Sequence, residues 1–307
     1  MPLTDNVALV SLTREISSRD LMRVAAALQK QVTRDFTPLW GLRATVDAFE
    51  ELSDVPSDYH PVVLFGDPDE LLGRLEFEIG DVKAARLVEQ FQGNRLGGVH
   101  LNAFTRQPFA LVAVSDGWSV AVSHEALEMI VDPFGNRLIA GAHPTNPEGE
   151  RVRYLVEVCD PCQTVWYPVN GERMSDFYTP RYFDPVRNPA AFYSFTGALR
   201  RPLDVVEGGY LTWIDPRDSG LYQLRGGEDE PVLLADILTL ARTSAPLRTV
   251  VDTNASSPRV TPESLTPADS ATAAVGSEGA VRDASRAAAL RTAEAFLSLA
   301  AEAESWD

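Results

Sequence analysis

Short apolar runs and longer stretches with a helical period alternate along this chain. The apolar runs predict β-strands, which are typically short and rich in branched and aromatic residues; they cover residues 7–12, 42–49, 61–65, 109–114 and 154–158. Apolar residues three and four positions apart predict helices over residues 17 or 18 to 36, 82–91, 118–132 and 231–243. This mixture of elements predicts an α/β (α+β) fold.

Prolines and glycines mark the ends of two of these helices. Pro38 and Gly41 are predicted to end the first helix. The helix that begins near Trp118 is predicted to end at Asp132, because the residue before a proline disfavours the helical conformation and Pro133 follows.

Composition divides the chain into a domain and a tail. Residues 1–243 are predicted to form one domain, with an N-terminal lobe over about 5–133 and an irregular C-terminal lobe over about 134–243. Residues 244–280 are rich in Ser, Thr, Pro and Ala, which predicts a flexible linker. The Ala-rich segment 281–304 predicts a terminal helix.

The charge composition argues against several classes of partner. The 307 residues carry 44 acidic and 27 basic side chains, a formal net charge of −17. This leaves no surplus of cations for nucleic-acid phosphates or an anionic membrane surface. The sequence has no long apolar run that predicts a membrane span, and its polar, acidic start lacks the features of a secretory signal. A cytoplasmic location is therefore expected, while association with a virion or non-classical export stays open, as does the oligomeric state.

The residues that indicate a chemistry lie in the helix predicted over 118–132. His124 and Glu128 are four positions apart, so they project from nearly one face of a helix, where both can bind one metal ion. Glu125 lies about 100° around the helix from His124, where a general base for a water beside the metal belongs. The pattern resembles the His-Glu-x-x-His helix of zinc peptidases, with glutamate in place of the second histidine.

An ordinary amphipathic helix with two solvated glutamates and a hydrogen-bonded histidine also fits this spacing. The residues around His124 and Glu128 favour the metal site, because they predict a mostly buried helix. The apolar ones are Val120, Ala121, Leu127, Ile130 and Val131. Buried carboxylates need a compensating partner, and this helix carries Glu125, Glu128 and Asp132. A metal cation supplies that compensation.

A catalytic zinc ion takes three protein ligands, so a third must come from elsewhere. Asp132 lies about 12 Å along the helix from His124, which is too far for a small ion. Glu157 and Asp160 come next, and in an extended strand they face opposite sides. One of them is expected to be a ligand, with Glu157 preferred, and the other is expected to orient His124. Zn²⁺ is the expected metal, although a histidine with two carboxylates also suits manganese or iron.

Five further residues are candidates for a role near this site. Tyr178 or His100 is a candidate to stabilise an oxyanion. The two cysteines, Cys159 and Cys162, are predicted to be ordinary half-buried thiols and not a redox pair. Met174 is similar in place to the methionine turn of one branch of metallopeptidases, but that branch's glycine and third histidine are missing, so packing is predicted for it.

Four segments of the chain, spread over roughly residues 5 to 220, resemble a poorly characterised bacterial and phage-associated branch of the zincin-like metallopeptidases. They are Trp118…Ser123-His124-Glu125-x-x-Glu128…Asp132-Pro133, Glu157-x-Cys159-Asp160, Ser175-Asp176-Phe177…Thr179-Pro180…Tyr182-Phe183 and Gly208-Gly209-Tyr210…Asp215-Pro216. The resemblance implies a zincin-like fold, in which a small twisted mixed sheet backs the metal-binding helix. It also implies a metal site, but no particular activity, because this branch has none firmly assigned.

Three functions follow from these residues. The first is a zinc-dependent peptidase or hydrolase that acts on a peptide or protein substrate, with water activated by Glu125. The second is a catalytically silent binding or structural protein with the zincin fold. The third is a glycoside hydrolase that uses paired carboxylates such as Glu125 and Glu157, with the aromatic-rich middle of the chain as a sugar platform.

Overall fold

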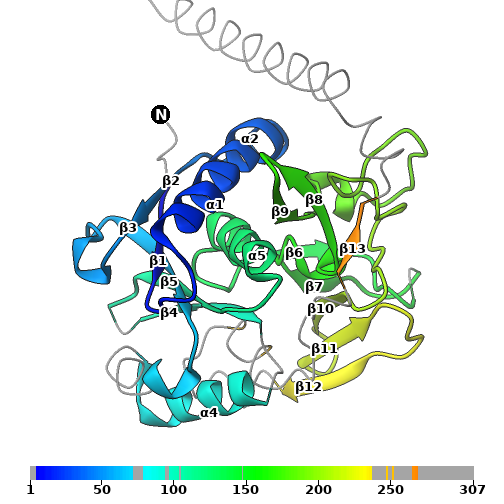
Figure 1. The fold of residues 1–307 in the computed structure, drawn as a ribbon. Helices are drawn as coiled ribbons and strands as arrows, with labels where there is room; N and C mark the ends of the chain where they lie inside the picture. Colours follow the sequence, from blue (N-terminus) through cyan, green and yellow to red (C-terminus); the bar gives the residue numbers. More distant parts are fainter. Residues whose placement is uncertain are drawn as a thin grey trace, which may run out of the picture.

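The N-terminal half of the chain forms a mixed five-stranded β-sheet (Figure 1). Its strands lie in the order β2-β1-β3-β5-β4, where β4 is antiparallel to β5 and the other neighbours are parallel. The strands are β1 (Asp5–Ser11), β2 (Ala44–Phe49), β3 (Tyr59–Phe65), β4 (Gly98–Asn102) and β5 (Pro108–Ala113). β4 is therefore an edge strand, and the sequence pattern had not predicted it.

The computed structural model describes residues 5–71, 79–93, 97–103, 105–146, 148–236, 247, 251 and 265–268. The helix predicted over 281–304 lies outside these residues. Most of the segment predicted to be a linker also lies outside them.

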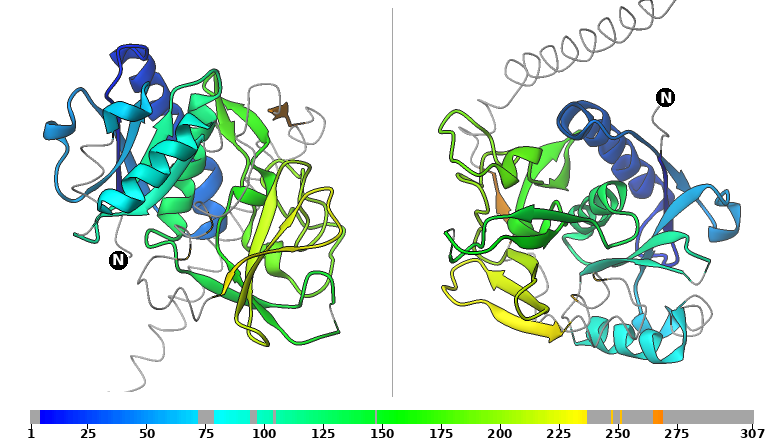
Figure 2. Two further views of the ribbon diagram at one scale, coloured as in Figure 1. Left: turned by 90° about the horizontal axis from the view of Figure 1, so that it is seen from below. Right: turned by 180° about the vertical axis from the view of Figure 1, so that it is seen from behind.

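Helices cover both faces of this sheet. They are α1 (Ser18–Lys30), α2 (Thr37–Trp40), α4 (Asp81–Gln92) and α5 (Trp118–Val131). The side chains of β3 alternate between two cores: Val62 and Leu64 face the side of α1 and α5, whereas Val63 and Phe65 face the side of α4. The sheet thus separates α4 from the pair formed by α1 and α5 (Figures 1 and 2).

The first helix runs further than predicted. Ser17 caps its start by accepting a hydrogen bond from the backbone N–H of Asp20. The chain stays helical through a π-helical turn (Gln31–Phe36) and α2 until Gly41, which has a φ of 70°. Pro38 does not end the helix; it lies in the first turn of α2, directly after the π-helical turn.

The C-terminal half forms two antiparallel arrangements of strands. One is a five-stranded sheet in the order β12-β11-β10-β7-β6, made of Val232–Asp236, Gly220–Arg225, Tyr210–Asp215, Val152–Leu155 and Leu138–Gly141. The other is the hairpin of β8 (Val165–Val169) and β9 (Glu172–Ser175), to which β13 (Thr266–Pro267) adds in parallel. Short 3₁₀ turns complete the fold at Leu52–Asp54, Pro68–Leu71, Asp160–Cys162 and Pro180–Phe183. A mixed α+β fold is confirmed.

Two predicted elements are wrong in their type or length. The helix predicted over 231–243 is strand β12 at Val232–Asp236, because this apolar run pairs with β11. Residues 237–243 lie outside the described residues. The strand predicted over 154–158 ends at Leu155, where its pairing with Leu138 of β6 ends. Within the segment predicted to be a linker, Thr266 donates its backbone N–H to Thr164 at 2.7 Å.

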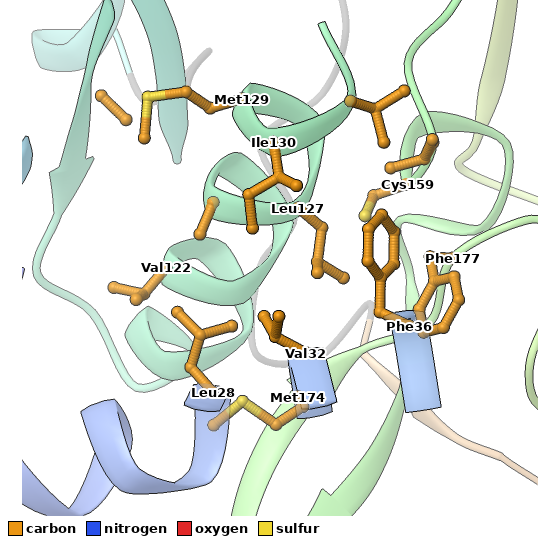
Figure 3. Close-up of a cluster of buried hydrophobic side chains, with 14 of the residues drawn as sticks. Leu28, Val32, Phe36, Val122, Leu127, Met129, Ile130, Cys159, Met174 and Phe177 are labelled. Carbon is orange, nitrogen blue, oxygen red and sulfur yellow. The ribbon is translucent and has the colours of Figure 1, made fainter. Parts of the chain in front are cut away.

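One hydrophobic core joins the two halves around α5. Figure 3 shows Leu127 and Ile130 of α5 beside Phe36, with Cys159 and Phe177 from the C-terminal half in the same cluster. Every residue of α5 except Trp118 and Ala121 is buried. The helix is thus enclosed on nearly all sides, as its apolar sequence predicted.

No helix in the described part of the chain is both long and apolar enough to cross a membrane.

The packing of α1 against this shared core leads to a prediction about the free energy of unfolding. Leu28→Ala should lower the free energy of unfolding by about 2–5 kcal/mol, because it leaves a cavity at a fully buried position. Chemical denaturation followed by circular dichroism measures this change. Leu233→Ala is the control, since Leu233 is 56% exposed and should tolerate the same change within about 0.5 kcal/mol. Equal effects of the two substitutions would contradict the packing.

Candidate metal centre

Two serines fix the position of α5 against the C-terminal half. The hydroxyl of Ser119 donates to the carbonyl of Arg173 at 2.9 Å, and the hydroxyl of Ser123 accepts the backbone N–H of Ser175 at 2.7 Å. With the apolar contacts around it, these bonds hold the helix in one rotational setting. His124, Glu125 and Glu128 therefore project in fixed directions.

His124, Glu128 and Asp160 meet at distances that suit metal ligands. The Nε2 atom of His124 lies 3.3 Å from Oε1 of Glu128 and 3.3 Å from Oδ1 of Asp160. Two ligand atoms about 2.0–2.1 Å from a tetrahedral zinc ion are about 3.3–3.4 Å apart. Charge-assisted hydrogen bonds are typically shorter, about 2.7–2.9 Å. These side chains therefore fit a divalent ion.

Cys159 lies beside the same three side chains. Its backbone N–H donates to Oε1 of Glu128 at 3.1 Å, which orients that carboxylate. Ligand atoms of His124, Glu128 and Cys159 all lie within 4.8 Å of one another. Burial, followed by the charge of Glu128, raises the pKa of the Cys159 thiol well above its usual value. The sequence did not single out this thiol as a ligand, although sulfur is a common zinc donor.

A second group of side chains faces the other oxygen of Glu128. His100 on β4 has Nδ1 3.7 Å from Oε2 of Glu128 and 3.4 Å from Oε2 of Glu125. Ligand atoms of His100, Glu128 and Glu157 all lie within 4.8 Å of one another. The strand alternation explains the orientation of His100, because its neighbours Val99 and Leu101 belong to the core on the α4 side.

Gly98 leaves the space that Glu125 occupies. A Cβ atom at residue 98 would lie 2.7 Å from Oε1 and 2.9 Å from Cγ of Glu125. Any other residue at this position would displace the glutamate. Glu125 is thus held between α5 and β4, with His100 on one side and the glycine backbone on the other.

The electrostatic environment of these residues favours a cation. Burial alone would lower the pKa of His124, but the charges of Glu128 and Glu125, together with hydrogen bonds to Asp160 and Glu128, outweigh it and hold that pKa well above its usual value. His124, Glu125, Glu128, Glu157 and Asp160 are all buried. The same negative potential that keeps a proton on His124 attracts a metal ion in its place.

The structure corrects the expectation that Glu157 and Asp160 lie in one extended strand. β7 ends at Leu155 and a 3₁₀ turn begins at Asp160, so the two residues are not on opposite faces of one strand. Asp160 lies against His124, whereas Glu157 groups with His100. Asp132 serves the turn after α5, where Oδ2 accepts the backbone N–H of Arg137 at 2.5 Å.

The remaining candidates have clear surroundings. Tyr178 is 1% exposed and stacks on Tyr182 with ring centroids 4.4 Å apart, and its hydroxyl has no hydrogen-bond partner among the described residues. Met174 packs in the core beside Leu28 (Figure 3), as predicted. Cys159 and Cys162 are free, fully buried thiols with raised pKa values, which does not suit a reactive redox pair.

No family model matches this chain, and comparisons with curated proteins and with solved structures give no match either.

Asp176 follows the candidate ligands along the chain, lies two residues before Tyr178 and holds the segment that carries it. Its carboxylate accepts the backbone N–H of Thr196 at 3.0 Å and the Thr196 hydroxyl at 2.6 Å. Burial raises the pKa of Asp176 from 3.8 to about 6, and the hydrogen bonds from Thr196 and Ser194 offset part of that rise.

The raised pKa of Asp176 leads to a prediction about how the stability of the protein changes with pH. The pKa of this carboxyl is higher in the folded than in the unfolded chain, so its contribution is fully present below about pH 4 and is lost as the pH rises through about 6. The loss is on the order of 2–3 kcal/mol, at about 1.4 kcal/mol per pKa unit. Asp176→Asn, which has the same shape and no charge, should lose less stability between pH 4.5 and 7. Parallel stability curves for the two proteins over this window would contradict the assignment.

Proposed function

We propose that this protein is a zinc-dependent hydrolase that cleaves peptide bonds. The observation that carries the proposal is the approach of Glu128 and Asp160 to His124, each at 3.3 Å, with Glu125 adjacent to His124 on α5. Three protein ligands and one open position are typical of catalytic zinc sites. Asp160 takes the place that the sequence pattern gave preferentially to Glu157.

Each side chain has a role in such a reaction. His124, Glu128 and Asp160 hold the ion, which when bound polarises a carbonyl and makes water more acidic. Glu125 takes the proton from the attacking water and passes it to the leaving amine. His100 orients Glu125 through the contact of 3.4 Å between Nδ1 and Oε2. The Tyr178 hydroxyl stays protonated, because burial raises its pKa well above its usual value, so it can donate a hydrogen bond to an oxyanion.

The position of β4 supports an extended peptide as the substrate. β4 is the edge strand next to α5 in the described sheet. An extended chain can pair with an edge strand through its backbone. Val99, His100 and Leu101 of β4 are buried in this structure, so such pairing requires that their backbone be uncovered. A peptide bound there would run past Gly98 and His100, and hence past Glu125.

The fold is consistent with the zincin-like resemblance. A mixed sheet with one antiparallel edge strand lies against α5, and a lobe of short strands and loops packs on the other side of that helix. We infer a zincin-like arrangement from this order of elements and from the helix that carries His124.

The burial of the site favours a second candidate function, a catalytically silent protein with a structural metal ion. Glu125 is 3% exposed, and the ligand candidates are equally enclosed by the described residues. An ion at this position would join α5 to the segment after β7, and so stabilise the junction of the two halves. Metal retained without cleavage of a diverse peptide library would favour this alternative.

The third candidate, a glycoside hydrolase, receives less support. Sugar-binding platforms need exposed aromatic rings, whereas most aromatic rings in the middle of this chain lie in the shared core. These buried rings are Tyr167, Phe177, Tyr178, Tyr182, Tyr193 and Trp213.

Glu125→Gln tests the catalytic proposal directly. The substitution keeps the shape of the side chain and removes the base, so turnover of a peptide library should fall by about 10²–10⁴-fold while bound metal is unchanged. Mass spectrometry of the library measures cleavage, and elemental analysis measures metal. Glu89→Gln, on the exposed side of α4, is the control and should leave both unchanged. Full activity of Glu125→Gln would refute the mechanism.

His124→Ala tests the metal site itself. The variant should contain less metal than the wild type after purification without chelator, and it should lose activity. It should also unfold more readily, by about 3–5 kcal/mol, because it leaves Glu128 and Asp160 buried beside a vacated position. Unchanged metal content in a folded His124→Ala protein would refute the site.

A further inference from the structure

The carboxylate of Glu128 lies between two histidines. Its Oε1 is 3.3 Å from Nε2 of His124, and its Oε2 is 3.7 Å from Nδ1 of His100. The two oxygens of one carboxylate thus face two different imidazole rings. A carboxylate in this position can bind a separate cation with each oxygen, as bridging carboxylates do in paired-metal sites.

Each side of Glu128 has a set of ligand atoms. Asp160 joins His124 on the side of Oε1, at 3.3 Å from its Nε2. Glu157 joins His100 and Glu128 in a second group whose ligand atoms lie within 4.8 Å of one another. The zinc site proposed above uses only the first group. The second is equally buried, since His100 is 1% and Glu157 is 3% exposed.

The charges of these side chains match two divalent ions better than one. Glu125, Glu128, Glu157 and Asp160 carry four negative charges when ionised. One divalent ion with two neutral imidazoles leaves a net charge of about −2 on the set, whereas two divalent ions bring it to zero. Net charge in a buried site is costly, so the second ion lowers the free energy of the loaded protein.

Tyr178 and His100 provide independent observations. The Tyr178 hydroxyl is buried without a hydrogen-bond partner among the described residues, and the charges of Glu157, Glu128 and Asp160 act on it. Nε2 of His100 is likewise buried and has no hydrogen-bond partner among those residues, so it is the ring nitrogen with a lone pair to offer while Nδ1 contacts Glu125. A buried hydroxyl without a hydrogen-bond partner is expected where a further ligand completes the site.

We propose that this protein binds a pair of divalent cations bridged by Glu128, one at His124 and Asp160 and the other at His100 and Glu157. The inference rests on the proposed metal centre and extends it to a two-metal site. Ligand sets of one imidazole and two carboxylates suit zinc, manganese or iron(II). Paired ions about 3.5–4 Å apart occur in hydrolases, where they act on the attacking and leaving oxygens.

Metal stoichiometry tests the pair. The full-length chain, loaded with Mn²⁺ or Zn²⁺ and desalted, should contain about two ions per chain. Glu157→Gln, which keeps the side-chain shape, and His100→Ala should each retain fewer than two ions while staying folded by circular dichroism. His60→Ala is the control and should keep both, because His60 on β3 is outside the two ligand groups.

Electron paramagnetic resonance of the Mn²⁺-loaded chain gives a second readout that is independent of activity. Bridged Mn²⁺ ions should show the spectrum of a spin-coupled pair, and Glu157→Gln should convert it to that of isolated ions. One ion per chain that is lost in His124→Ala but kept in folded Glu157→Gln and His100→Ala would overturn the pair and leave the proposed hydrolase standing. No bound metal in the wild type would overturn both proposals.

Discussion

Four carboxylates and two imidazoles are buried around α5, and the need to compensate their charge governs this region of the protein. Buried carboxylates are stable only beside cations or hydrogen-bond donors. His124 responds to this environment with a raised pKa, because the neighbouring acids outweigh its own burial. A divalent ion held by His124, Glu128 and Asp160, as proposed, would meet the same need with more charge.

The architecture brings these groups together from three separate elements. His100 comes from the edge strand β4, Glu128 from α5, and Asp160 from the 3₁₀ turn after β7. None of these elements positions the site alone. The shared core around Leu127 joins the two halves, so the site depends on the docking of both lobes against α5.

Hydrogen bonds and close packing restrain the site. Ser119 and Ser123 bind the backbone of β9, and Glu125 fills the space that Gly98 leaves. A general base gains from such restraint, because proton transfer requires the donor and acceptor atoms at hydrogen-bond distance. The burial that provides this restraint also limits access for a substrate. The catalytic function requires that a substrate reach β4, whereas the structural function does not.

The sequence by itself determined the local features of this protein. The apolar period of α5 and Pro133 set the ends of that helix to within one residue, and the spacing of His124 and Glu128 placed both on one face. Helical and strand periods depend only on neighbouring residues, so a single sequence contains them. The same information predicted four of the five strands of the N-terminal sheet and a buried environment for the acids.

Only the tertiary structure decided which distant residues meet. The run Val232–Asp236 is apolar enough for a helix or a strand, and its hydrogen bonds to β11 made it a strand. Glu157 and Asp160 reach the site together because β7 ends at Leu155 when its partner strand ends, a limit set by residues far away in sequence. His100 faces Glu128 because β4 pairs with β5 in one register. Contacts of this kind depend on long-range packing, which no local pattern of residues specifies.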